Sequence, residues 1–551
     1  MRARAGSVVA AILVSGLVVP LAGWGQTKPT AASTLAASAQ ELEHQQRWLE
    51  AAQVYAQLIT AEPDNPSWQE GLRRCLIQER IAQRYRDGAI RHIMSTWKLA
   101  QALAAYDELT RLIEQVVIDH ITVEQLWRRG CEQVLLALNN RIYREVAFRA
   151  KPSASQLEKL RSLLEMEMSR SPEAWSELTG LVRSLAERAA LYAPMRPTSL
   201  VWEFLAAHCE SVDAYGAYVT PTGLVLEKIL VEEKWAGVGL TVLATDQGVV
   251  IIAVAPQSEA HRHGIVPGSK LTRVNGEPLH ALSTEEVMLR LLGQPDTNVT
   301  LEVVLPDGTP QSFTLTRRRL DVPSVTETTM LDSMLGIGYI RITQFQPNTP
   351  QELDQALEEL NQRGLRVLLL DLRGNPGGSV RAALDVADRF ISEGILLRTE
   401  GRLPELTAAY HARRGNDWQI PLIVLVDENT ASAAEMVAAA LQAQAQAVRL
   451  PVAIVGKPTR GKAVLQHLIP LAEGHAGAAY LTVARWLTPA GTPISPQGIQ
   501  PDVLVKVIVP MHVEPMMDMD MLPMGDMNGS IEGVAWQTAL RKAVQFFYPH
   551  P

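Results

Sequence analysis

The chain has 551 residues and a formal net charge of −8 at pH 7. A chain of this length is too long for a single hydrophobic core, so we expect three or four domains. The sequence contains no long basic stripe, which argues against nucleic acid as a partner.

Residues 1–25 predict a secretion signal. Arg2 and Arg4 form a positive start, and Val8 to Leu21 is mostly apolar but too short to span a bilayer comfortably. Small residues before Gln26 offer a cleavage point. The alternative is an uncleaved membrane anchor. We therefore expect an exported protein, periplasmic or extracytoplasmic, that is tethered to the membrane only if the signal stays.

Three cysteines stand far apart, at Cys75, Cys131 and Cys209. An odd number at wide spacing predicts neither a disulfide framework nor a metal site. We expect buried thiols within helices.

Residues 34–195 carry helical periodicity. Ala51, Tyr55 and Pro63 fall on the small, aromatic and proline positions of a tetratricopeptide-like unit, but only one such unit is visible. A solenoid needs several repeats, so an ordinary helical hairpin is the favoured interpretation. The region offers a surface for an adaptor or for self-association, and the sequence does not choose between them.

Residues 234–320 change to short β-rich runs around one helix, with turn signals between them. The loop G-V-G-L and the run H-G-I-V-P-G-S-K-L-T-R-V-N-G-E-P-L together resemble a PDZ domain. The resemblance implies that Gly237, Val238, Gly239 and Leu240 form the loop that binds a C-terminal carboxylate, while the peptide adds as a strand. Glycines of an ordinary β-turn are the alternative.

Residues 321–509 alternate strands and helices, which predicts an α/β core with a largely parallel sheet. Residues 510–530 hold seven methionines and one histidine among Pro, Gly and Asp. This composition favours a linker over a copper(I) site. Residues 531–551 contain a last predicted helix. The fold class expected for the whole chain is multidomain α+β.

Ser432 follows the predicted strand Leu422 to Val426 and precedes an alanine-rich helix. A serine there lies where the helix dipole stabilises developing negative charge, as a nucleophile requires. Together with Glu435 it also matches S-x-x-E, so helix capping is the competing interpretation.

Lys462 is the candidate base in G-K-P-T-R-G-K-A, and Gln466 could orient its amine. A solvated surface lysine is the ordinary alternative. The same letters differ at one position from a phosphate-binding loop, because Ala463 stands where a Mg²⁺-binding hydroxyl belongs.

Two backbone N–H groups are the candidate oxyanion donors, those of Gly378 and Ala433. Gly378 belongs to the turn D-L-R-G-N-P-G-G-S, and Ala433 follows the serine. Turns at the ends of two strands of one sheet can aim two donors at one oxygen. A tight turn that merely needs positive φ is the alternative for the glycines.

From about Ser199 onward, the chain resembles the carboxy-terminal processing proteases. The motifs G-Y-I-R-I-T-Q-F, L-L-L-D-L-R-G-N-P-G-G, T-A-S-A-A-E, G-K-P-T-R-G-K-A-V-L-Q and L-T-P-A-G-T-P-I-S-P-Q-G-I-Q-P-D-V follow in the family's order, and residues 199–233 match its segment before the PDZ domain.

The resemblance implies a serine endopeptidase with a Ser–Lys dyad at Ser432 and Lys462, supported by Gln466, with no cofactor. It also implies substrates with accessible apolar C-termini. The rivals are a non-catalytic PDZ scaffold with a degenerate protease core, and an acyl-CoA enzyme built on a related sheet.

Overall fold

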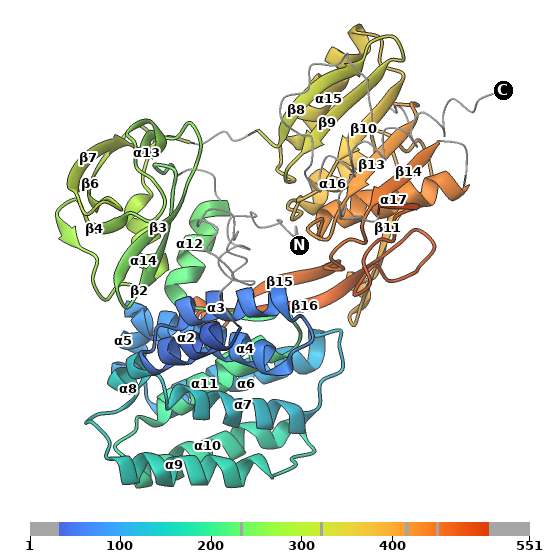
Figure 1. The fold of residues 1–551 in the computed structure, drawn as a ribbon. Helices are drawn as coiled ribbons and strands as arrows, with labels where there is room; N and C mark the ends of the chain where they lie inside the picture. The colour runs from blue at the N-terminus through green and yellow to red at the C-terminus, as the bar shows by residue number, and fades with distance from the viewer. Residues whose placement is uncertain (1–31, 232–234, 320–322, 414–417, 448–450, 506–551) are drawn as a thin grey trace. The chain divides into compact units, whose positions relative to one another are not determined.

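The computed structural model describes residues 32–231, 235–319, 323–413, 418–447 and 451–505 (Figure 1). The predicted signal, the Met-rich segment and the last predicted helix lie outside them. The described chain divides into two compact units, residues 32–319 with 467–482, and residues 323–466 with 483–505. No helix within the described residues is long and apolar enough to cross a membrane.

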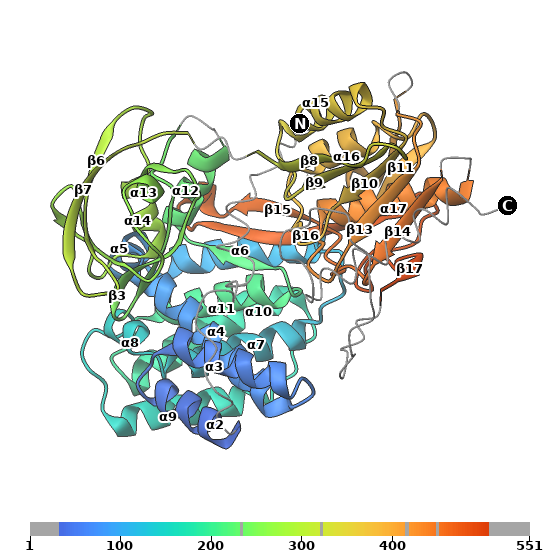
Figure 2. The ribbon, with the colours of Figure 1, turned by 45° about the horizontal axis from the view of Figure 1, so that its top comes forward.

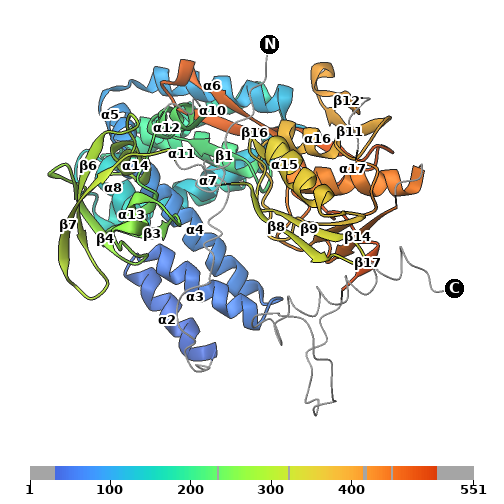
Figure 3. The same cartoon turned by 90° about the horizontal axis from the view of Figure 1, so that it is seen from above.

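The first unit begins with helical hairpins, in which α2 packs on α3 and α3 on α4 (Figure 3). Gly71 of α4 lets the ring of Tyr55 approach, since a Cβ on Gly71 would lie 2.5 Å from that ring. The helices are α2 (Ala32–His44), α3 (Trp48–Ala61), α4 (Pro66–Arg86), α5 (Gly88–Thr96), α6 (Leu99–Val116), α7 (Val123–Ala137), α8 (Arg141–Ala147), α9 (Ala154–Met168), α10 (Trp175–Tyr192), α11 (Pro197–Ser211) and α12 (Pro221–Val231).

A buried ion-pair network joins α4 to α11. The guanidinium of Arg84 lies 2.8 Å from Glu203 and 2.7 Å from Glu210, with only 3% of the Arg84 side chain exposed. Burial lowers the pKa of His208, also in α11, to about 4. The three cysteines are buried and unpaired in α4, α7 and α11, which confirms the prediction of buried thiols.

A five-strand antiparallel path in the order β2-β3-β4-β6-β7 follows, with α14 packed against β2 (Figure 1). Figure 2 shows α13 and α14 together with β3, β6 and β7 in this part of the chain. Among the strands of the described residues β2 pairs only with β3, so it is an edge strand. The elements are β2 (Leu240–Thr245), β3 (Gly248–Val254), α13 (Glu259–Arg262), β4 (Lys270–Val274), β5 (Glu277–Pro278), α14 (Thr284–Leu291), β6 (Asn298–Val304) and β7 (Pro310–Thr316). Strand β1 (Ala217–Val219) pairs instead with residues 478–480.

The second unit is built on a six-stranded sheet in the order β17-β14-β13-β10-β9-β8. All neighbours are parallel except β8 and β9. The strands are β8 (Val325–Asp332), β9 (Ile337–Ile342), β10 (Val367–Asp371), β13 (Leu422–Val426), β14 (Val452–Gly456) and β17 (Val503–Leu504). The expected multidomain α+β class and the largely parallel sheet are therefore confirmed.

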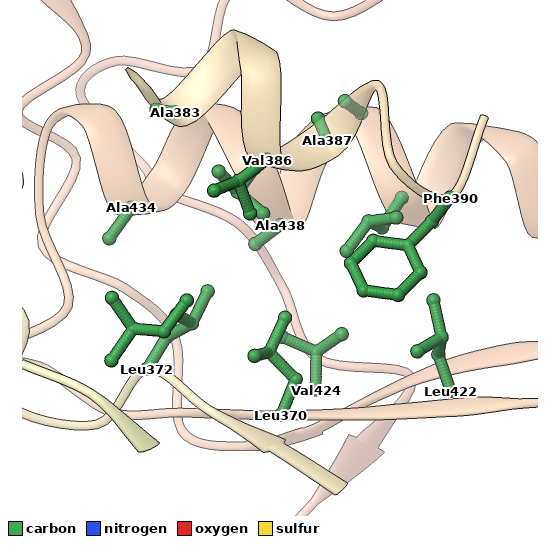
Figure 4. Packing of buried hydrophobic residues seen from close by; sticks show 14 of the residues in the cluster. Leu370, Leu372, Ala383, Val386, Ala387, Phe390, Leu422, Val424, Ala434 and Ala438 are labelled. Carbon is green, nitrogen blue, oxygen red and sulfur yellow. The ribbon is translucent and has the colours of Figure 1, made fainter. Parts of the chain in front are cut away.

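Three helices cover one face of this sheet, α15 (Thr349–Gln362), α16 (Val380–Ala387) and α17 (Ala433–Ala447). Figure 4 shows Val386 of α16 and Ala438 of α17 above Leu370 and Val424 of the central strands. In the same unit β11 (Ile395–Gly401) pairs with β12 (Ala408–His411) and with residues 484–487 of β16 (Ala478–Leu487), which follows β15 (Val464–Pro470) in the chain. Because β10, β13 and β14 are parallel, their carboxyl ends meet at one edge of the main sheet.

Candidate active site

Ser432 lies in the turn between β13 and α17 and is half-buried. Its φ is +55°, a left-handed conformation that non-glycine residues rarely adopt. An ordinary N-cap residue has β-region dihedrals, so simple capping does not explain this geometry. Among the described residues, only one bond of a capping box is present, from Ser432 N–H to Glu435 Oε2 at 2.8 Å.

Glu435 connects the serine turn to the loop that carries Lys462. Its second oxygen, Oε1, accepts from Thr459 Oγ1 and from Gly461 N–H, each at 2.6 Å. The carboxyl is fully buried, and burial raises its pKa although these hydrogen bonds lower it. The sequence marks Glu435 only as part of S-x-x-E, and its link to the second loop is not visible there.

The lysine loop runs from β14 to β15 beside the serine turn. Arg460 N–H donates to Thr430 O at 3.0 Å, next to the serine turn. Gly461 needs to be glycine, because a Cβ there would lie 1.9 Å from Pro496 O. Thr459 N–H donates to Ile499 O at 3.1 Å, so a segment late in the chain braces this loop.

Lys462 follows Gly461 directly and is half-buried rather than enclosed. Gln466 lies four residues further on, within β15, and is half-buried too. Lys457, a neighbouring positive charge in the sequence, forms an ion pair with Glu428 at 2.9 Å on the surface. Glu435 thus joins the backbone next to Lys462 to the turn that carries Ser432.

The phosphate-binding alternative for this loop is wrong. Such a loop must open a helix, whose N-terminal N–H groups cradle the phosphates. Here the residues after Lys462 form the strand β15.

The glycine turn after β10 is held by Asn375, which is fully buried. Its Oδ1 accepts from Gly377 N–H at 2.8 Å, its Nδ2 donates to Ile342 O at 2.9 Å, and its backbone carbonyl accepts from Ala431 N–H at 2.9 Å. Nothing in the letters R-G-N-P-G-G singles out this side chain. It ties the glycine turn to the serine turn.

Gly377 and Gly378 both have positive φ, +102° and +133°. A Cβ on Gly377 would lie 2.7 Å from the Ser432 Cβ and 2.9 Å from the Ala433 nitrogen, so only glycine permits this approach. The backbone carbonyl of Phe345 accepts from Ser379 N–H, and its N–H donates to Gly377 O, each at 2.8 Å. In such a parallel bridge the N–H of Gly378 points away from Phe345.

Ala433 is the first residue of α17, where the helix leaves its N–H groups without intrahelical partners. The structure therefore brings the turns of Gly378, Ser432 and Ala433 together at one edge of the sheet. This arrangement can hold an oxyanion beside a serine hydroxyl.

The sequence comparisons identify the family. The family model for peptidase family S41 matches residues 336–505, and the PDZ domain model matches residues 227–304. A carboxyl-terminal-processing protease of Picosynechococcus sp. is 32% identical over 53% of this chain and 70% of its own length. The chain belongs to the carboxyl-terminal-processing proteases of peptidase family S41.

Two further comparisons cover a smaller part of this chain or have a lower sequence identity. The carboxyl-terminal-processing protease of Synechocystis sp. is 36% identical over 49% of this chain and 62% of its own length, so less than two thirds of that relative is spanned. A solved structure of a photosystem II D1 C-terminal processing protease aligns over 79% of this chain and 96% of that chain, at 22% identity and a TM-score of 0.43.

The predicted carboxylate loop of this family member precedes β2 in its PDZ domain. The carbonyls of Val238 and Gly239 accept from Ala260 N–H at 3.1 Å and from Ala255 N–H at 2.8 Å, and Gly239 has φ +83°. Gly237 N–H donates to Arg318 O at 3.2 Å, so this one of the four predicted loop residues has its N–H already bonded. Leu240 is the first residue of β2.

Within the residues that the structure describes, no group of His, Cys, Asp and Glu is arranged to hold a metal ion.

Proposed function

We propose that this chain is an exported serine endopeptidase that binds protein C-termini through its PDZ domain and cleaves by a Ser–Lys mechanism. The proposal rests on the hydrogen bonds that Glu435 accepts. One buried carboxylate accepts from the backbone of Ser432 and from that of Gly461, next to Lys462. A buried acceptor shared by two loops holds them in one fixed arrangement, as a nucleophile and its base require.

In the proposed mechanism the Ser432 hydroxyl attacks the scissile carbonyl while the neutral amine of Lys462 takes its proton. The N–H groups of Gly378 and Ala433 stabilise the oxyanion. Lys462 then gives the proton to the leaving amine, and the acyl-enzyme remains. Water, deprotonated by the same amine, attacks the ester and releases Ser432. We assign to Gln466 the role of orienting the side chain of Lys462.

The PDZ domain is assigned the recognition of an apolar C-terminal tail, with the N–H groups of Val238, Gly239 and Leu240 facing the carboxylate. Export rests on residues 1–25, whose sequence carries a positive start and a short apolar run. We assign to the helical region, residues 34–195, the role of binding an adaptor or of self-association. We also propose the domain limits 1–25, 34–195, 199–233, 234–320, 321–509, 510–530 and 531–551.

The test uses protein from Gln26 onward together with Ser432→Ala and Lys462→Ala. Each protein is incubated with an unfolded reporter that ends in either an apolar or a charged tail. We expect cleavage by the unsubstituted protein alone, faster for the apolar tail, and an acyl-enzyme visible by mass spectrometry after rapid quenching. Binding of the apolar tail without cleavage or acyl-enzyme would favour the non-catalytic scaffold.

A further inference from the structure

Within the part of the chain that the structure describes, β3 is the only strand paired with β2. A peptide can therefore add to the PDZ sheet along the free edge of β2. Along an antiparallel strand, the N–H and C=O groups of successive residues point alternately to one side and to the other. Ile251, opposite Val242, donates its N–H to Ser269 O on the far side, which places Val242 in a non-hydrogen-bonded pair with β3. The backbone groups of Leu240, Val242 and Ala244 therefore face the free edge.

At Ala244 both edge groups already have partners. Its N–H donates to Thr284 Oγ1 of α14 at 3.0 Å, and its carbonyl accepts from Gln83 Nε2 of α4. The Thr284 hydroxyl donates in turn to Gln83 Oε1 at 3.1 Å. These three residues form a closed ring of hydrogen bonds, which we call the Gln83 clasp. Ala244 and Thr284 are buried, so the clasp is not a solvent-exposed contact.

The clasp is supported by one contact within α4 and by contacts from α4 and α5 to the PDZ domain. Gln83 Nε2 also donates to Glu79 Oε1 at 2.7 Å, one helical turn earlier. Arg86, buried near the end of α4, forms an ion pair with Asp246 in the turn after β2. Gly88 N–H donates to Glu286 Oε1 of α14 at 3.3 Å. The helical region thus fixes the end of β2 and the start of α14 together.

We propose that the Gln83 clasp limits the length of tail that the PDZ domain reads as a strand. The inference rests on the proposed tail recognition. With the carboxylate at Val238 to Leu240, the last residue of the tail pairs with Leu240, the third from the end with Val242, and the fifth from the end with Ala244. Because the clasp occupies Ala244, strand pairing ends at the third residue, and the substrate leaves the sheet edge there.

The experiment measures binding of fluorescent apolar tail peptides to the Ser432→Ala protein by anisotropy. One peptide replaces the amide N–H of the third residue from the end by an ester oxygen, and a second does so at the fifth residue. The first substitution removes a hydrogen bond to Val242 O and weakens binding about three- to tenfold. The second leaves binding within twofold. In a Gln83→Ala background, Ala244 O is released, and the second ester now weakens binding by a similar factor.

Gln69→Ala is the matched control, because Gln69 lies in the same helix and donates to Pro63 O, away from the PDZ domain. A Gln83→Met protein keeps a side chain of similar length that cannot donate to Ala244 O, and it serves as the second variant if Gln83→Ala does not fold. Equal weakening by both esters in the parent protein overturns the length limit. So does a fifth-residue ester that stays neutral in both variants. Failure of the unmodified tail to bind overturns the proposed tail recognition and this inference with it.

Discussion

Replacing Glu435 by glutamine tests whether one carboxylate holds the nucleophile turn and the lysine loop in place. The side chain keeps its size but exchanges one acceptor oxygen for an NH₂ group. If the amide oxygen takes the place of Oε1, it still accepts from Thr459 and Gly461, but the NH₂ group then faces the N–H of Ser432. The opposite orientation is worse, because the NH₂ group then faces the N–H of Gly461, and the Thr459 hydroxyl loses the oxygen to which it donates.

The magnitude follows from the single bond that cannot be kept. A buried hydrogen bond to a carboxylate contributes about 1.5–3 kcal/mol, and its loss leaves the Ser432 N–H opposite another donor. We expect the free energy of unfolding of the core to fall by about 2–3 kcal/mol. Ser432 holds a left-handed φ that the lost bond supports. If the reaction requires that geometry, the same energy lowers kcat roughly 30- to 150-fold.

The assay is reporter cleavage with kcat and KM separated, together with thermal unfolding. KM should stay unchanged, because Glu435 contacts the two loops and not the substrate. Glu428→Gln is the control, since Glu428 lies in the same turn but forms its ion pair with Lys457 at the surface, where an ion pair contributes little. A kcat within twofold of the parent and an unchanged melting temperature for Glu435→Gln would refute the positioning role.

Two further predictions concern other parts of the chain. Gly461→Ala should abolish cleavage and destabilise the core, because its Cβ would lie 1.9 Å from Pro496 O and its φ is +78°; a cleavage rate near that of the parent would contradict this. Burial in α12 raises the pKa of Glu227 to about 7. Between its ordinary value of about 4.5 and 7 the folded chain binds the extra proton, so the stability from this group is present at low pH and lost as pH rises through 7, by about 3 kcal/mol. Glu227→Gln should flatten that decline in pH-dependent unfolding, and an unchanged slope would count against it.

The sequence predicted the elements of the core well, because they are strongly patterned. The strand Leu422 to Val426 is observed with those bounds. The apolar residues from Ser379 to Ile391 recur at a spacing typical of a helix, yet α16 is shorter and ends at Ala387. Periodicity fixes which residues are buried but says less about where a helix frays into a turn.

The candidate site was less predictable, because its geometry depends on contacts between distant segments. The motif S-x-x-E suggested a cap, whereas Glu435 bridges to residues 24 and 26 positions away in the chain. The left-handed φ of Ser432 has no signature in the side chain itself. Nor does a sequence show that Gln83 in a helical hairpin satisfies the edge of a strand 161 residues further on.

The brace between Thr459 and Ile499 has a consequence for biosynthesis. The glycine turn, the serine turn and the lysine loop follow three parallel strands that are adjacent in the sheet yet come from residues 367 to 456, and the loop is completed only by Ile499. Contacts between such distant segments form late in folding. Under the proposed mechanism, a chain that is still being synthesised therefore carries Ser432 long before it can use it. The emerging polypeptide is inert toward its neighbours and toward its own unfolded segments.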